Sequence, residues 1–153
     1  MNWHPEQLHE LQDRLDTLAV AARQMLAVLS GEYDSLAARN APSPELLHEK
    51  ARLAGILESE KATFDAFRAT LHTEHLEEAL RLATDQRCFR RWADVRHLLE
   101  QCDYHNEVNG RLLNRLHARN RLFDRILRQQ VTDPTYSRHG QLADGRQGSL
   151  GKA

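Results

Sequence analysis

Aromatic residues are scarce in this sequence, and residues that break helices are scarce over most of its length. Phe, Trp and Tyr together make up 6% of the 153 residues. Four of the seven glycines and one of the four prolines fall after Val131, which leaves three of each before it. The remainder is rich in Leu, Ala, Arg and Glu, a composition that favours helices over sheets.

Long apolar runs are also missing. No window of eighteen residues is uninterruptedly apolar, so we expect no membrane insertion. The first ten residues, MNWHPEQLHE, have neither the basic stretch nor the apolar stretch of a secretory signal. These two absences predict a cytoplasmic protein.

The sequence has only two cysteines, Cys88 and Cys102. They are fourteen residues apart on what we expect to be one helix, which separates them by roughly 21 Å at ~1.5 Å per residue. That distance is too long for a disulfide within one chain. Reduced thiols fit a cytoplasmic protein.

Charge is unevenly spread along the chain. Residues 1–80 carry seven basic and fourteen acidic side chains, net −7, and residues 81–131 carry eleven basic and six acidic, net +5. A basic half can indicate nucleic-acid binding, or it can belong to a basic helix that packs beside an acidic helical pair. We favour the second interpretation, with no nucleic-acid partner, because the whole chain is nearly neutral and has no platform of aromatic and basic residues.

A first series of apolar residues runs from Leu8 to Leu36 in alternating steps of three and four, and Glu32 occupies the one site that is skipped. This is the a/d pattern of a helix that packs against a partner helix. The following segment, ARNAPSPE, breaks the helix, and Ser43 before Pro44 predicts an N-cap followed by a first helical residue.

A second series runs from Leu46 to Leu71, with Lys50 and Glu60 at two of its sites. The segment HLEEALRLA after it predicts a short helix. The third series runs from Trp92 to Gln130. It predicts one helix over residues 86–131.

Three long helices joined by short turns close most simply as an antiparallel bundle. We therefore expect an all-α protein: an antiparallel helical bundle or coiled coil of three long helices plus a short connecting helix over residues 1–131. Residues 132–153 are predicted to form a flexible C-terminal tail, because they hold too few apolar groups to offset the entropy of ordering. The third series is longer than the other two, and its unmatched apolar residues favour self-association into a homo-oligomer.

The stretch NEVNG, Asn106 to Gly110, interrupts the third series with three residues that form helices poorly. Buried asparagines at Asn106 and Asn109 would fix helix register at some cost in stability. Gly110 could instead allow another backbone to come close, or act as a hinge. The segment could also be an exposed polar contact surface for a partner.

The eight residues NEVNGRLL, from Asn106 to Leu113, resemble the N-x-x-N-G-x-[LI]-[LI] signature of FlgN-type flagellar type III export chaperones. In that family a tail with a Y-G-x-x-G-like element follows the helix. This chain has Tyr136-Ser-Arg-His-Gly140, in which serine replaces the first glycine. The length, the helical series and the glycine-rich end are similar as well.

The resemblance implies a cytoplasmic chaperone that binds the C-terminal helical segment of the hook-filament junction proteins FlgK and FlgL. Such a chaperone prevents premature assembly of its clients and delivers them to the type III export gate. The sequence does not distinguish FlgK from FlgL as the client. The resemblance also implies that Tyr136 and Gly140 contact either the client or the export gate.

We predict that the client helix binds along the late part of the third helix, where apolar anchors recur at helix-in-groove spacing. Six arginines, at positions 111, 115, 119, 121, 125 and 128, are expected to rim this groove and steer acidic client residues. The same apolar residues could instead be bundle core. The predicted client-binding residues are Asn106, Asn109, Gly110, Leu112, Leu113, Leu116, Phe123, Ile126 and Leu127.

No catalytic or metal site is predicted, and no cofactor. The pairs His72/His75 and Cys102/His105 have ligand-like spacing, but neither has a second pair at a recognisable interval. No sequence motif of a zinc peptidase, a phosphate-binding loop or a nucleophile elbow occurs. We therefore do not expect an enzyme. The alternative to a chaperone is a structural coiled-coil adaptor protein with no export role, whose third helix would be covered along its length.

Overall fold

The computed structural model describes residues 3–71, 76–82 and 86–132, and all regular structure within them is helical. The expected all-α bundle of three long helices and one short connecting helix is confirmed. Residues 133–153, most of the predicted tail, lie outside the described residues. The helices are α1 (Pro5–Ala37), α2 (Pro44–Thr70), α3 (Leu76–Leu82) and α4 (Gln86–Thr132).

The first two helices begin at capped residues, and the second begins where the sequence predicts. His4 forms a capping box with Gln7 ahead of Pro5, the first residue of α1. The Ser43 side chain accepts a hydrogen bond of 3.2 Å from the backbone N–H of Leu46 at the start of α2. Such caps satisfy backbone donors that have no partner inside the helix. The predicted boundaries of α1 and α2 are therefore set by local chemistry.

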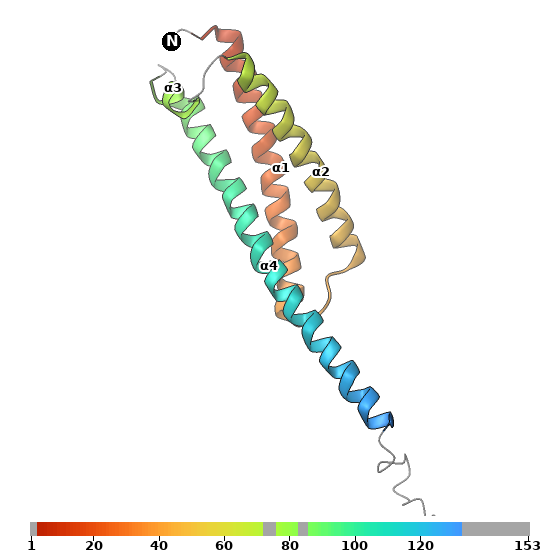
Figure 1. Ribbon diagram of the computed structural model, residues 1–153. Coiled ribbons are helices and arrows are strands. Elements are labelled where there is room, and N and C mark those ends of the chain that lie inside the picture. Colours follow the sequence, from red (N-terminus) through yellow and green to blue (C-terminus); the bar gives the residue numbers. More distant parts are fainter. Residues whose placement is uncertain (1–2, 72–75, 83–85, 133–153) are drawn as a thin grey trace, which may run out of the picture. The chain divides into compact units, whose positions relative to one another are not determined.

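The chain divides into two units, residues up to Leu113 and residues from Asn114 onward. In the first unit α2 runs antiparallel to α1, while α4 runs parallel to α1 (Figure 1). Contacts between α1 and α4 follow the same order in both helices. Gln12 Nε2 donates to Cys88 Sγ at 3.4 Å, and Cys102 Sγ donates to the Ala22 carbonyl at 3.4 Å. This up-down-up order is what short connections between three long helices require.

Two apolar clusters form the core of the first unit. One joins the early part of α1 to α3 and the ends of α2 and α4 that lie beside it, and contains Leu11, Leu15, Leu18, Phe64, Phe67, Leu76, Leu80, Cys88 and Val95. The other lies further along α1 and contains Ala22, Met25, Leu29, Leu53 and Cys102. The first two apolar series of the sequence thus supply much of the core, and α3 and the early part of α4 supply the rest.

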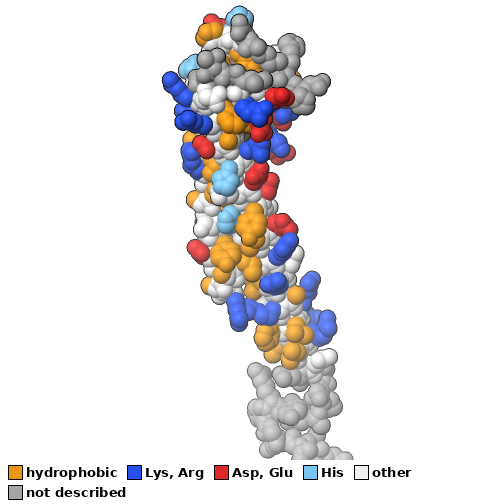
Figure 2. Space-filling model, turned by 90° about the vertical axis from the view of Figure 1, so that its left-hand side faces the viewer, with side chains coloured by type: hydrophobic (Ala, Val, Ile, Leu, Met, Phe, Trp, Pro, Cys, Tyr) orange, Lys and Arg blue, Asp and Glu red, His pale blue; other side chains and the backbone are white. Residues whose placement is uncertain are grey.

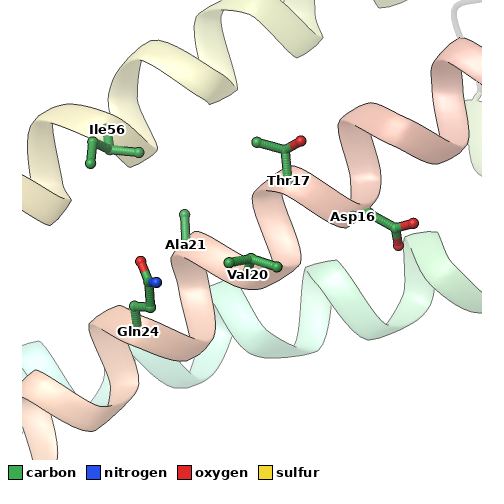
Figure 3. A pocket seen from close by; sticks show the side chains of 6 residues that line it. All are labelled: Asp16, Thr17, Val20, Ala21, Gln24 and Ile56. Carbon is green, nitrogen blue, oxygen red and sulfur yellow. The ribbon is translucent and has the colours of Figure 1, made fainter.

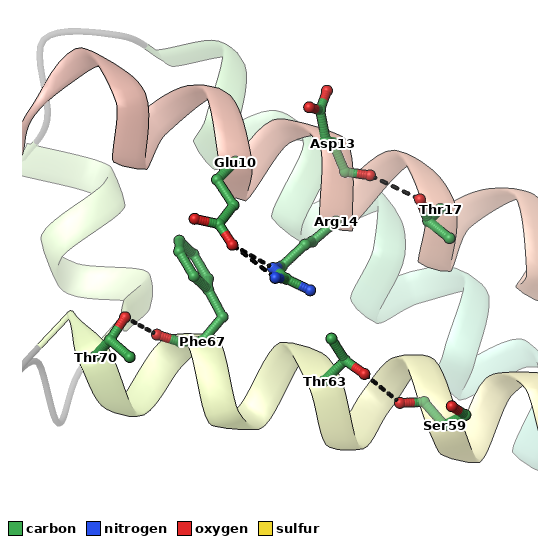
Figure 4. A network of polar contacts seen from close by, with 8 residues as sticks. All are labelled: Glu10, Asp13, Arg14, Thr17, Ser59, Thr63, Phe67 and Thr70. Carbon is green, nitrogen blue, oxygen red and sulfur yellow. Dashed lines mark hydrogen bonds and ion pairs between the residues drawn. The ribbon is translucent and has the colours of Figure 1, made fainter.

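Aromatic rings link α2 to both of its neighbours. The rings of Phe64 and Trp92 stack, with centroids 5.5 Å apart and planes 14° apart. Arg14 lies 5.2 Å from the centroid of the Phe67 ring and is held there by Glu10, as Figure 4 shows. Stacked and cation–π pairs of this kind contribute about 0.5–1.5 kcal/mol each. One face of Trp92 is therefore occupied inside the bundle.

Ion pairs also join α4 to the acidic part of the chain. Arg91 pairs with Asp16 of α1, and Arg96 pairs with Glu77 of α3. All four side chains are about half exposed, so each pair contributes at most about 1 kcal/mol. The pairs fit the interpretation that a basic helix packs beside acidic ones.

The buried residues of α4 follow a strict seven-residue spacing: Cys88, Val95, Cys102 and Asn109 are each at most 7% exposed. Asn106, which the sequence pattern places on the same face, is exposed. The buried residues occupy a narrower strip of the helix surface than the predicted series, because residues seven apart lie within about 20° of each other around a helix. The register interpretation therefore applies to Asn109 and is wrong for Asn106.

Neither cysteine forms a disulfide, as their spacing predicts, and both are buried. Burial, followed by the Asp103 carboxylate, raises the pKa of the Cys102 thiol from 9.0 to about 11. The protonated thiol is thus favoured in the folded chain, and the stability it contributes is lost as pH rises from about 9 through 11.

We expect the Cys102 thiol to be almost inert near neutral pH. At pH 8 its thiolate fraction is roughly a hundredfold below that of an ordinary thiol. Maleimide labelling of the Cys88→Ala variant, followed by mass spectrometry, measures this directly. Labelling of the native chain should be at least about a hundredfold slower than in denaturant, and should accelerate as pH rises. Equal rates in the two states at pH 8 would contradict the burial of this thiol.

Candidate functional site

Three helices meet at a buried polar cluster formed by Asn109, Glu32 and Lys50. Asn109 Nδ2 donates to the Leu29 carbonyl at 2.9 Å and to Glu32 Oε2 at 2.8 Å. Lys50 Nζ donates to both carboxylate oxygens of Glu32, at 3.0 and 2.8 Å. Asn109 is 1% exposed and Glu32 is 3% exposed. The cluster therefore ties α4 to α1 and α1 to α2 through one carboxylate.

This cluster favours one register of the three helices. A buried carboxylate is costly unless it is paired and hydrogen-bonded, and only one alignment brings an ammonium and an amide to Glu32. Asn109 Oδ1 is buried and accepts no hydrogen bond from the described residues, which costs about 1–3 kcal/mol. Leucine at position 109 would avoid that cost. The asparagine is thus better explained by register than by stability.

The sequence singled out the members of this cluster separately but not together. In the apolar series Glu32 and Lys50 are charged residues at apolar sites, and Asn109 is a polar residue at such a site. A rule that pairs opposite charges at apolar sites of neighbouring helices could have joined Glu32 to Lys50. The addition of Asn109 needed the three-dimensional alignment of α1 and α4.

Gly110 lies on the exposed side of α4. A Cβ atom built on Gly110 would meet nothing within 4 Å, so no backbone of the described chain uses the space that glycine leaves. The interpretation of Gly110 as a site of close backbone approach within the chain is therefore wrong. α4 continues through this residue without a break. Asn106 and Gly110, both exposed, share a stretch that is open to a partner.

The next predicted client-binding residues are partly covered. Leu112 and Leu113, at the end of the first unit, are half-buried, and so is Leu116 in the second unit. Each therefore presents only part of its side chain. Their partial burial fits leucines that pack within the chain and also present part of the side chain to a partner.

The second unit carries a row of large exposed hydrophobic side chains near the end of α4. Their exposed fractions are 53% for Leu122, 57% for Phe123, 42% for Ile126 and 58% for Leu127. The spacing of three and four places them on one side of the helix, and we call these four residues the apolar row. The predicted residues Phe123, Ile126 and Leu127 belong to it. Leu122 was missed, although its spacing of four to Ile126 could have revealed it.

Arginines accompany the apolar row. The segment from residue 111 to 129 holds six arginines and one aspartate, and Figure 2 shows basic and hydrophobic side chains together over the last described turns of α4. At about 100° per residue, Arg115 and Arg119 lie on the side of the row. Arg121 and Arg128 lie on the opposite side, so the predicted rim of six arginines is wrong for these two. Arg125 lies about 60° from Leu122 and borders the row.

A shallow groove of about 350 Å³ lies on α1 beside α2. It is lined by Asp16, Thr17, Val20, Ala21, Gln24 and Ile56, as Figure 3 shows. The one titratable group there, Asp16, is paired with Arg91. The groove therefore offers a small apolar surface and no arrangement of acids and bases.

The remaining predictions concern the tail contacts, a metal site and membrane insertion. Tyr136 and Gly140, the predicted tail contacts, lie outside the described residues, as do His72 and His75. Within the described ranges no group of three or more His, Cys, Asp or Glu residues is placed to hold a metal ion. None of the described helices is both long and apolar enough to cross a membrane.

Comparison with known proteins places the chain in a family. The family model described as FlgN protein matches residues 1–144, which includes all four helices. Comparisons with curated proteins and with solved structures found no match.

Proposed function

The chain belongs to the FlgN family of flagellar export chaperones, and from this premise we propose which clients it serves and how. It binds the C-terminal helical segment of the hook-filament junction proteins FlgK and FlgL in the cytoplasm. Binding prevents these proteins from assembling early, and the complex delivers them to the type III export gate. No covalent chemistry and no cofactor are needed for this task.

The observation that supports the proposal is the apolar row. An amphipathic client helix carries its own apolar side, and it can lay that side along anchors spaced at three and four residues. Phe123 and its three neighbours are 42–58% exposed in the free chain, so they are available without unfolding any part of the bundle. Arg115 and Arg119 lie on the same side and attract acidic residues of the client.

The other predicted client-binding residues divide into two roles in this proposal. Leu112, Leu113 and Leu116 add contacts with the exposed part of their side chains. Asn106 and Gly110 are exposed and serve as contacts. Asn109 is buried, so we assign it to holding the register of α4 rather than to touching the client.

The adaptor alternative predicts a third long helix that is covered along its length. Leu122, Phe123, Ile126 and Leu127 are each more than 40% exposed, which favours the chaperone. An exposed row also favours self-association of the free chain, and sedimentation velocity across a range of concentrations tests for a homo-oligomer.

Titration calorimetry with the C-terminal helical peptide of FlgK, and separately with that of FlgL, tests the proposed function. We expect saturable binding of at least one peptide at one site per chain. A scrambled peptide of the same composition is the control, because it keeps the charge and loses the apolar side. Absence of binding to both peptides, with the chain folded by circular dichroism, would favour the adaptor.

The tail residues are assigned by the same experiment. If Tyr136 and Gly140 contact the client, Tyr136→Ala weakens peptide binding. If they contact the export gate, the same variant leaves peptide binding unchanged and reduces export of the junction proteins in cells.

A further inference from the structure

The end of α4 combines an exposed apolar side with a strongly basic opposite side. We propose that this segment, residues 111–129, also binds anionic lipid surfaces, and lies along them without spanning the bilayer. The inference goes beyond the proposed client binding and does not rest on it. It assigns to the same helix a second, mutually exclusive occupant of the apolar row.

The apolar row has the composition of the lipid-facing side of an interfacial helix, and Arg115 and Arg119, which precede the row on the same side, can extend to the headgroups on their long side chains. Such helices place Phe and Leu in the boundary between lipid headgroups and acyl chains, and keep Lys and Arg on the other side. The apolar row supplies one phenylalanine, two leucines and one isoleucine, all exposed. The helix itself is already formed in the free chain, so binding would not have to meet the cost of folding it.

The position of the arginines is what favours a lipid surface over a peptide. Arg121 lies about 160° from Phe123 around the helix and at least about 100° from every residue of the apolar row. A client helix docked on the apolar row would not reach it. An anionic membrane attracts every charge within a Debye length, about 10 Å at 0.1 M salt, which is close to the diameter of a helix.

Arg121 is also available to take part. It is exposed, and it forms no ion pair with any residue in the described part of the chain. Arg111 pairs with Glu107, but the segment from 111 to 129 holds six arginines against one aspartate, so its net charge remains positive. Charges on the far side of the row therefore contribute to binding at an anionic lipid surface, whereas they contribute little to binding a peptide that is docked on the row.

Nucleic acid is the other polyanion that such a segment could attract. Phosphate contacts would engage the arginines, but they would leave the apolar row in water. A lipid surface buries the apolar row beside its acyl chains and attracts the arginines with its anionic headgroups. For that reason the observations favour a lipid surface. The two occupants differ in salt dependence, because nucleic-acid binding by arginines is lost steeply with salt, whereas apolar burial is not screened.

The test is co-flotation of the full chain with vesicles of phosphatidylcholine alone or with 30% phosphatidylglycerol. We expect binding only to the anionic vesicles. The variant Arg121→Gln should weaken vesicle binding about fivefold, since each arginine near an anionic surface strengthens binding roughly fivefold. The same variant should leave the affinity for a junction-protein peptide within twofold. The matched control is Arg23→Gln, which removes one exposed arginine elsewhere and should bind vesicles like the unchanged chain.

Three results would overturn the proposal. One is the absence of flotation with anionic vesicles at 50 mM salt. Another is equal loss of vesicle binding in the control and in the far-side variant, which would mean that net charge alone is responsible. The third is tighter binding to a single-stranded oligoribonucleotide than to vesicles, abolished at 300 mM salt. None of these results bears on peptide binding, so the client proposal stands or falls separately.

Discussion

Replacing Lys50 by methionine should lower the free energy of unfolding by about 3 kcal/mol, because it leaves the Glu32 carboxylate buried without its cation. The side chain of Glu32 is 4% exposed and that of Lys50 is 25% exposed. Methionine keeps most of the aliphatic stem of lysine, so the decrease in the free energy of unfolding measures the removal of the charge and not a loss of packing. Urea denaturation monitored by circular dichroism measures it.

Two controls separate this pair from a general effect of charge. Lys61→Met removes an exposed lysine of the same helix and should change stability by less than about 0.5 kcal/mol. The double variant Glu32→Leu/Lys50→Met removes both charges and should regain most of the loss, since apolar replacements of buried ion pairs are often neutral. A Lys50→Met variant as stable as Lys61→Met would mean that water reaches Glu32 and that the cluster does not set the register.

The second large effect concerns the apolar row. Phe123→Gln/Leu127→Gln should weaken binding of the junction-protein peptide at least about 30-fold, because each large apolar side chain contributes about 1.5–3 kcal/mol when it is fully buried, and these two are only partly exposed before binding. Glutamine keeps helix propensity. The two side chains are 57% and 58% exposed in the free chain, so its melting temperature should hardly change. Titration calorimetry and a thermal melt measure the two quantities.

The matched control uses apolar residues with similar exposure on other helices. Val20 on α1 is 53% exposed and Leu47 on α2 is 46% exposed. Val20→Gln/Leu47→Gln should bind the peptide as the unchanged chain does. Peptide affinity within threefold of the unchanged chain for the Phe123/Leu127 variant would remove the apolar row from the client site.

Much of the fold was predictable because its signals are local. Pro5 and Ser43-Pro44 mark helix starts that the structure confirms, since a cap depends only on residues within one turn. The apolar series identified the inward side of α1 over its whole length, including the unusual Glu32. The family signature around Asn109 was recognisable for the same reason, as it is a short stretch of adjacent residues.

The candidate site was predicted less completely. Phe123, Ile126 and Leu127 were expected at a partner surface and are exposed, but their spacing fits the core of a bundle equally well. Asn109 was expected to touch the client and is instead buried against Glu32. Arg121 and Arg128 were expected beside the row and lie on the other side of the helix, because the direction of a side chain depends on its position within the helical turn and not on the net charge of the segment.

By itself, the sequence determined which residues form helices and which side of each helix is apolar, because caps and periodicity act over a few neighbouring residues. The tertiary structure alone decided which of those sides are covered. Val95 and Phe123 follow the same series along α4, yet one is 1% exposed and the other 57%. Periodicity orients a side chain, but burial requires another helix opposite it, and that depends on how segments far apart in the chain are aligned. The meeting of Glu32, Lys50 and Asn109 from three helices has the same cause.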